Sequence, residues 1–180
     1  MRRTSVGASQ CPVARSMELV GDWWTILILR DALQGLSRFD EFERSLGIAP
    51  NILAGRLKLL VQEQMLERRR YSDRPVRHEY VLTSRGQDFL PVIQALLAWG
   101  NRHLAPEGPS VVIAHQPTGA VADPVLVDRH TGLPLSDPAF QIAAGPVAGE
   151  TVRWRIEAAR ARKSAPAAGP LPGPRAGLNS

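Results

Sequence analysis

The sequence is poor in cysteine, and this scarcity narrows the structural classes open to it. Cys11 is the single cysteine among 180 residues. One thiol cannot form an intrachain disulfide framework, and it cannot supply a cysteine-based zinc finger within one chain. We therefore expect no structural metal and no cofactor.

The sequence also lacks long apolar runs. The longest apolar stretch, around Trp23 to Leu29, is broken by Thr25 and is far too short to span a bilayer. The first residues include two arginines with no apolar run behind them, which argues against a signal peptide. We expect a cytoplasmic protein with no membrane partner.

The residue clusters typical of enzymes do not stand out. The sequence offers no clear pair of nucleophile and base, no cluster of metal-binding residues and no glycine-rich phosphate loop. We therefore expect that the protein is not an enzyme.

What the sequence does contain is positive charge concentrated in one place. The formal net charge is +5 and the pI is about 10.3. Between Pro50 and His78, seven basic side chains are opposed by three acidic ones, so most of the excess charge lies there. A basic surface favours polyanionic partners, although it also serves solubility.

The first part of the chain is typical of short helices separated by glycine and proline. A short helix should follow Cys11, with Pro12 in its first turn. Asp22 is a good N-cap for an apolar and deeply buried helix over residues 23–34. Ser37, with Asp40 three residues later, is typical of a capping box for a third helix.

A fourth helix should begin at Pro50, with an apolar stripe of Leu53, Leu57 and Leu60 at helical spacing. Gly47 ends the third helix shortly before it. Two helices joined by a tight turn that contains glycine form a helix-turn-helix candidate.

The stretch 67–83, "ERRRYSDRPVRHEYVLT", predicts a β-hairpin. Its two halves are rich in β-formers, and "SDRP" between them has the residues of a turn. Tyr80 and Leu82 should share one face of the second strand. A long helix should then run from Thr83 or Ser84 to about Leu104, with Pro91 kinking it or falling in its first turns.

The character of the chain changes after Ala105. Proline and glycine become dense, and short apolar runs such as "SVVIA", "PVLV" and "TVRWRI" alternate with turns. We expect a disordered N-terminus over 1–10, a winged-helix domain over 11–105, a small β-rich appendage over 106–157 and a disordered tail over 158–180. The predicted fold class is thus mainly α with a β-hairpin wing, plus a small C-terminal β appendage.

Four blocks of the sequence agree in order and spacing with one family. They are "CPV", "GDWWTILILRDAL", "SRFDEFERSLGIAPNILAGRLKLL" and "RPVRHEYVLTSRGQDFLPVIQALLAWG". Over about the first 105 residues the chain resembles the HxlR-type winged helix-turn-helix regulators, relatives of the MarR group. The resemblance implies a homodimer that binds double-stranded operator DNA and regulates transcription. The family often has a glycine where this chain has Gln64, and polar residues where it has Ala54 and Gly55.

The fourth helix would be the recognition helix, because a helix fits the major groove and its N-terminal half meets base edges. The candidate contact residues of this helix and of the helix before it are Arg38, Pro50, Asn51, Ala54, Arg56 and Lys58. Ala54 could touch a thymine methyl, while Arg56 and Lys58 could pair with guanine or with phosphates. The alternative is an ordinary helix with a solvated polar face.

The wing offers two further candidates, Arg74 and Arg77, at or beside the hairpin tip, where they can reach the DNA backbone or the minor groove. Arg68 to Arg70 alternate in direction along a strand, so they cannot all face the DNA. At least one of them should cover the core or pair with Glu67 or Glu79.

Cys11 is the candidate for redox sensing. A cysteine just before a helix-starting proline lies near the positive end of the helix dipole, which lowers a thiol pKa. Several members of the family sense quinones, hypochlorite or electrophiles with a cysteine at this motif. The alternative is an inert thiol packed at the dimer interface. A small-molecule effector between subunits is a further option.

Two other features have simpler interpretations. Trp23, Trp24 and Trp99 could line a ligand pocket, but core and dimer-interface positions are favoured. The appendage contains "HQPTG" and "DRHTG" at places where some relatives resemble a zinc ribbon. Thr118, Asp128 and Thr131 stand where cysteines would be needed, so we expect two metal-free turns. The rival function is a winged-helix protein-interaction module without specific DNA binding.

Overall fold

The computed structural model describes residues 10–164, and the expectations for residues 1–9 and 165–180 lie outside this range. The chain begins with two helices, α1 (Pro12–Val20) and α2 (Trp23–Leu33). The Asp22 side chain accepts a hydrogen bond from the Trp24 amide at 3.1 Å, which confirms the predicted N-cap. Ile28 and Leu29 of α2 are fully buried, as its apolar sequence predicts.

The next two helices form the predicted helix-turn-helix, α3 (Phe39–Leu46) and α4 (Pro50–Gln62). The capping box predicted from Ser37 and Asp40 is wrong. Glu41 instead accepts hydrogen bonds from the amides of both Ser37 and Arg38, each at 2.9 Å. A carboxylate one turn into the helix therefore satisfies donors that precede it.

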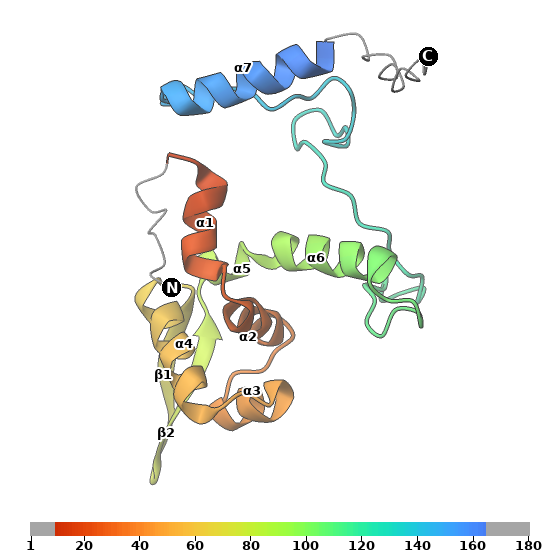
Figure 1. The fold of residues 1–180 in the computed structure, drawn as a ribbon. Helices are drawn as coiled ribbons and strands as arrows, with labels where there is room; N and C mark the ends of the chain where they lie inside the picture. The colour runs from red at the N-terminus through yellow and green to blue at the C-terminus, as the bar shows by residue number, and fades with distance from the viewer. Residues whose placement is uncertain (1–9, 165–180) are drawn as a thin grey trace, which may run out of the picture.

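The hairpin consists of β1 (Leu66–Asp73) and β2 (Val76–Leu82), paired antiparallel with Asp73 opposite Val76 at the tip. Figure 1 shows it extending beyond α3 and α4. The amide of Tyr80 also donates to the carbonyl of Ser37 at 2.7 Å, which ties β2 to the start of α3. The predicted wing and its connection to the core through Tyr80 and Leu82 are confirmed.

The long helix predicted after the wing is divided into α5 (Ser84–Gln87) and α6 (Leu90–His103). Thr83 caps α5 through a bond from the Gly86 amide to its hydroxyl. Pro91 lies in the first turn of α6, where the missing amide hydrogen costs no helical hydrogen bond. One of the two positions expected for Pro91 is thus confirmed.

The β appendage is limited to two isolated bridges, Ala114 with Val121 and Val127 with Pro134. The strand expected at "TVRWRI" is wrong, because these residues lie in α7 (Glu150–Ser164). The alternating pattern fits a helix as well as a strand, since Val152 and Ile156 share one face of a helix at i and i+4. Residues 158–164, expected in a disordered tail, belong to the same helix.

The hydrophobic core lies entirely within the winged-helix body, which we define as residues 11–89. Its buried members come from α1, α2, α3, α4, the loops around them and the start of β1. They are Val20, Ile28, Leu29, Ala32, Phe42, Ile48, Leu53, Leu57, Leu60, Met65 and Leu66. Beyond Gly86, no residue that the structure describes is buried.

Candidate nucleic-acid interface

The two faces of α4 divide between the core and solvent. Leu53, Leu57 and Leu60 are fully buried. Asn51, Ala54 and Lys58 lie on the opposite side, three to four residues apart, and are exposed, as is Pro50 at the start of the helix. Four of the five predicted contact residues of α4 therefore share an open surface.

Gly55 adds a second property to this surface. A Cβ atom built at Gly55 would meet no other atom within 4 Å, so nothing in the fold itself requires glycine there. The missing side chain leaves the helix backbone open to the closest approach by another molecule.

Arg56, the fifth candidate on α4, is engaged within the protein. Its Nη2 donates to Oδ2 of Asp22 at 2.8 Å, and both side chains are partly buried. The ion pair joins the N-terminus of α2 to α4 and fixes the rotation of α4 on the body. The predicted direct contact by Arg56 remains untested, and its observed geometry suits a positioning role.

The wing arginines separate into paired and unpaired groups. Arg69 pairs with Glu79 at 2.8 Å, as expected for one of the three strand arginines. Arg70 pairs with Asp73 at 2.8 Å, and Arg68 contacts His78 at 3.0 Å. Arg74 and Arg77 are exposed, and none of the ion pairs within residues 10–164 includes them.

Arg38 lies where the wing meets α3. Its guanidinium carbon is 4.7 Å from the centre of the Tyr71 ring, a cation–π contact. The amides of Ser37 and Arg38 donate to Glu41 and hold the pKa of that carboxyl below its usual range. Arg38 thus remains exposed, while Glu41 binds its backbone amide and the Tyr71 ring contacts its guanidinium.

Sequence reasoning missed two residues of this region, Asp22 as the partner of Arg56 and Tyr71 as the partner of Arg38. The sequence marks Asp22 only as a helix cap. The tertiary contact of each residue depends on how α2, α4 and the wing pack, and no sequence spacing reveals that.

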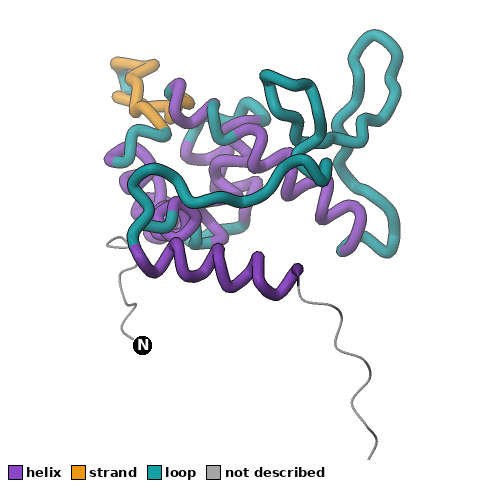
Figure 2. The backbone as a smooth tube through the Cα atoms, turned by 90° about the horizontal axis from the view of Figure 1, so that it is seen from above, coloured by secondary structure: helices purple, strands orange, loops and turns teal. Residues whose placement is uncertain are grey.

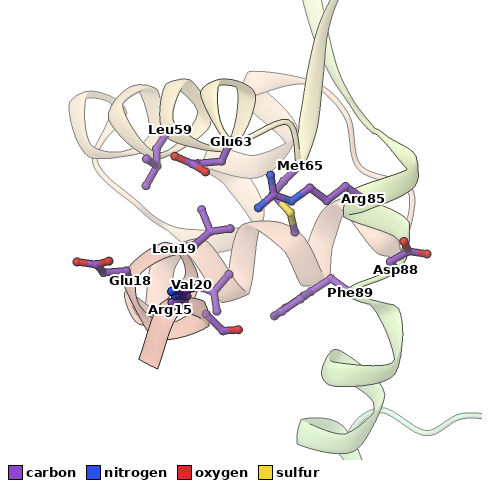
Figure 3. A pocket seen from close by; sticks show the side chains of 11 residues that line it. Arg15, Glu18, Leu19, Val20, Leu59, Glu63, Met65, Arg85, Asp88 and Phe89 are labelled. Atoms are coloured by element: carbon purple, nitrogen blue, oxygen red, sulfur yellow. The ribbon is translucent and has the colours of Figure 1, made fainter. Parts of the chain in front are cut away.

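A hollow of about 720 Å³ lies behind α4, among α1, the end of α4 and α5 (Figure 3). Its inner wall is apolar, with Val20, Met65 and Phe89. Its rim carries charges of both signs, including Glu63 and Arg85. The hollow therefore suits a molecule with an apolar body and polar ends, and a bound molecule would touch both α1 and α4.

Cys11 precedes α1 and lies beside α7. The guanidinium nitrogens of Arg155 are 3.8 and 3.9 Å from its sulfur. The thiol pKa is lowered, chiefly by the Ala14 amide in the first turn of α1 and next by Arg155. The sequence predicts that the helix terminus lowers the thiol pKa, and Arg155, from the C-terminal part of the chain, lowers it further.

The three candidate tryptophans differ in burial, and the two appendage turns contain side-chain hydrogen bonds of their own. Trp23 and Trp99 are 69% and 55% exposed, so neither belongs to the core of this chain, while Trp24 packs against it. His115 contacts Thr118 at 2.9 Å, and Asp128 accepts from the Thr131 hydroxyl at 2.8 Å. Over residues 10–164, no group of three or more His, Cys, Asp or Glu side chains could hold a metal ion.

None of the described helices is both long and apolar enough to cross a bilayer.

Residues 19–108 match the profile of a family described as HxlR-like helix-turn-helix. The HTH-type transcriptional regulator Rv3095 of Mycobacterium tuberculosis is 45% identical over 121 residues, which cover 67% of this chain and 77% of that protein. YodB, an HTH-type transcriptional regulator of Bacillus subtilis, is 33% identical over 56% of this chain and 92% of its own.

Two solved structures are similar over more of the chain. The transcription factor PA1607 has a TM-score of 0.69 at 34% identity, covering 79% of this chain and all of its own. PA1374 from Pseudomonas aeruginosa has a TM-score of 0.57 at 49% identity, covering 81% of this chain and all of its own. These shares exceed what residues 11–105 could supply, so both structures also match part of the C-terminal region.

Proposed function

The chain belongs to the HxlR-like helix-turn-helix family of transcriptional regulators, and from this premise we propose that it binds operator DNA sequence-specifically as a homodimer. The observation that carries the proposal is the open face of α4, with Asn51, Ala54 and Lys58 exposed. Arg74 and Arg77 at the wing are exposed as well. A helix in the major groove would read bases while unpaired cations beside it contact phosphates.

The roles within this interface follow from the partners of each side chain. Asn51 and Ala54 suit base edges, an amide for adenine and a methyl group for thymine. Lys58, Arg38, Arg74 and Arg77 suit phosphates, which would also remove the mutual repulsion of the wing cations. Arg56 would act through Asp22, by keeping α4 at the correct angle.

We further propose that α1 and α6 form the dimer interface. Val92, Leu96 and Trp99 of α6 are exposed at i, i+4 and i+7, and Val13 and Met17 of α1 are exposed as well. Exposed apolar rows of this kind mark interaction surfaces. Two copies related by a twofold axis would present two recognition helices to a palindromic site.

The test is binding to a palindromic fragment from near the gene of this protein, at several salt concentrations. A specific regulator should prefer that fragment over random DNA and should lose affinity steeply as salt rises. If the fragment binds no better than random DNA at any salt concentration, the proposal fails, and the rival protein-interaction module is favoured.

The wing offers a sharper version of this test. Arg74→Ala should weaken binding by a similar factor on all sequences and lower the magnitude of the salt slope by about 1, because a phosphate contact carries no base information. Arg69→Ala is the matched control, since Glu79 already pairs with Arg69. An effect of Arg74→Ala that is confined to one base position would contradict the backbone role.

Regulation through Cys11 or through a small molecule is a secondary proposal. A lowered thiol pKa favours the thiolate, which is the form that reacts with oxidants and electrophiles. If wild type and Cys11→Ser lose DNA binding equally under oxidant, the proposal of thiol sensing is wrong.

The hollow behind α4 is the candidate site for a small-molecule effector. Leu59→Trp should imitate a bound effector there and change the affinity for operator DNA. An unchanged affinity would contradict an effector site in this hollow.

A further inference from the structure

In the C-terminal arm, which we define as residues 106–164, none of the side chains of residues 106–163 is buried. It nevertheless carries many large apolar side chains. Those that are exposed are Val111, Val112, Val121, Val125, Leu126, Val127, Leu133, Leu135, Ile142, Val147 and Trp154. Soluble monomers seldom leave so many apolar side chains of one segment in water.

Within a single chain, the arm buries too little apolar surface to offset the entropy cost of ordering its backbone. Fixing the backbone of each residue costs conformational entropy, and burial of apolar surface is the main term that offsets it. The winged-helix body has a buried core to meet this cost. The arm has only two isolated bridges and one helix in its described residues. Its ordered conformation therefore requires a second surface against which its apolar side chains can pack.

The start of the arm and the start of its helix α7 are attached to two different helices earlier in the chain. At its start, Asn101 of α6 donates to the carbonyl of Val111 at 2.8 Å, and Arg102 pairs with Asp123 at 3.1 Å. Just before α7, the amide of Gly149 donates to the Gln10 side chain at 2.7 Å, next to α1. Figures 1 and 2 show the arm leaving the end of α6 and returning to lie over the start of α1.

We propose that the C-terminal arm is a clasp that packs on a second copy of this chain, seated on α1 and α6. The inference rests on the dimer of the proposed function, and it assigns to the arm a share of the interface. A partner on α1 and α6 would meet the arm, because the arm begins on α6 and the start of its helix α7 lies beside the start of α1 (Figure 1). Val111 and Val112 also border the same hollow as Leu90 and Ile93 of α6, so arm and helix present one continuous apolar surface.

The number of exposed apolar side chains favours a second copy as the occupant. A stable interface takes about 800 Å² from each partner, and the arm adds eleven exposed large apolar side chains to the six of α1 and α6. An interface formed by the two helices alone would leave most of the arm's apolar side chains in water. The alternative is that an unrelated protein covers this surface, and the experiment must distinguish it from a second copy of the chain.

Sedimentation equilibrium of the full chain tests the proposal. Leu126→Asp and Ile142→Asp place a charge on exposed apolar positions of the arm. Each should raise the dimer dissociation constant at least about tenfold, because burial of a carboxylate without a partner opposes association. Val76→Asp is the matched control, since Val76 is 56% exposed and Leu126 is 57% exposed, but Val76 lies at the wing tip.

The proposal is overturned if the arm variants dimerise as tightly as the wild type, or if the wild type is a monomer at every concentration. Far-UV circular dichroism and thermal melting of the variants check that the winged-helix body stays folded. Operator binding by the wild type is a separate readout. A tight dimer that ignores operator DNA would refute the proposed function and leave the clasp intact.

Hydrogen exchange gives a second, independent readout. In the wild type, amides of the arm should exchange more slowly when the protein concentration rises above the dissociation constant. Exchange that stays fast at every concentration would overturn the proposal, because the arm would then be solvated in the dimer as well. Slow exchange with no concentration dependence would do the same, since it would place the packing surface within one chain.

Discussion

The winged-helix body and the C-terminal arm have similar supplies of apolar residues and use them differently. In the body, Phe42, Ile28 and Leu53 are fully buried and meet in one cluster. In the arm, Val125, Leu126 and Ile142 are exposed. The difference shows that apolar content alone does not make a core. The apolar residues must also recur on one face of elements that pack against each other.

The spacing of residues explains this difference. In α4, Leu53, Leu57 and Leu60 recur every three to four residues, so a single helix face can bury all of them. In the arm before α7, proline and glycine interrupt each apolar run after a few residues, so no regular element forms a face there, and most residues of α7 itself are polar. Such a segment can still bury its side chains, but only against a surface that something else provides.

The comparison of body and arm predicts that the largest difference in stability loss follows removal of a phenylalanine ring from each region. Phe42→Ala should destabilise the protein by about 3–5 kcal/mol, because the removed ring leaves a cavity in the core. Phe140→Ala, at a half-buried position of the arm, should cost less than about 1 kcal/mol in the monomer. Urea denaturation of dilute protein, followed by circular dichroism, measures both. Equal losses would mean that the arm has a core of its own.

Two glycines provide the next test. A Cβ atom at Gly86 would clash with the carbonyl oxygen of Met65, whereas one at Gly100 in α6 would meet no atom within 4 Å. Gly86→Ala should therefore cost about 1–3 kcal/mol through overpacking, while Gly100→Ala should add up to about 1 kcal/mol through helix propensity. Unfolding midpoints of dilute protein report both changes. A loss from Gly100→Ala would mean that another surface packs closely on α6.

The body could be predicted from sequence because its signals are local. Asp22, Gly47 and Pro50 mark helix ends through backbone chemistry that acts within one turn. The leucine spacing of α4 then indicates which face is buried. The same local signals placed the open face of the candidate DNA interface, including Asn51 and Lys58.

The errors occur where a local pattern has two solutions or where a partner lies far along the chain. Glu41 competes with Asp40 for the same backbone donors, and the longer side chain reaches them from one turn into the helix. "TVRWRI" fits both a strand and a helix, and its environment decides between them. The pairs Arg56–Asp22 and Cys11–Arg155 join positions that only the folded chain brings together.

Gln64 tests how much strain the body tolerates. Its φ of 56° lies in the left-handed region, which costs an L-residue roughly 1–2 kcal/mol. Gln64→Gly should therefore stabilise the protein by about 0.5–1 kcal/mol, after the greater unfolded-state entropy of glycine is subtracted. Thermal unfolding measures the change. Gln62→Gly, in the last turn of α4, is the control and should destabilise, so a loss for both variants would contradict the strain at Gln64.

The contact between Cys11 and Arg155 joins the two regions, and it predicts the smallest effect. The thiol pKa is lowered first by the Ala14 amide and second by Arg155. Arg155→Ala should therefore raise the pKa only part of the way toward its ordinary value and slow alkylation at neutral pH, because less thiolate is present. The pH profile of the iodoacetamide reaction measures this. Arg153→Ala is the control, since its guanidinium instead donates to the carbonyl of Ala148. If both variants leave the profile of the wild type unchanged, α7 does not lie against α1 in solution, and the pKa of Cys11 depends on the helix terminus alone.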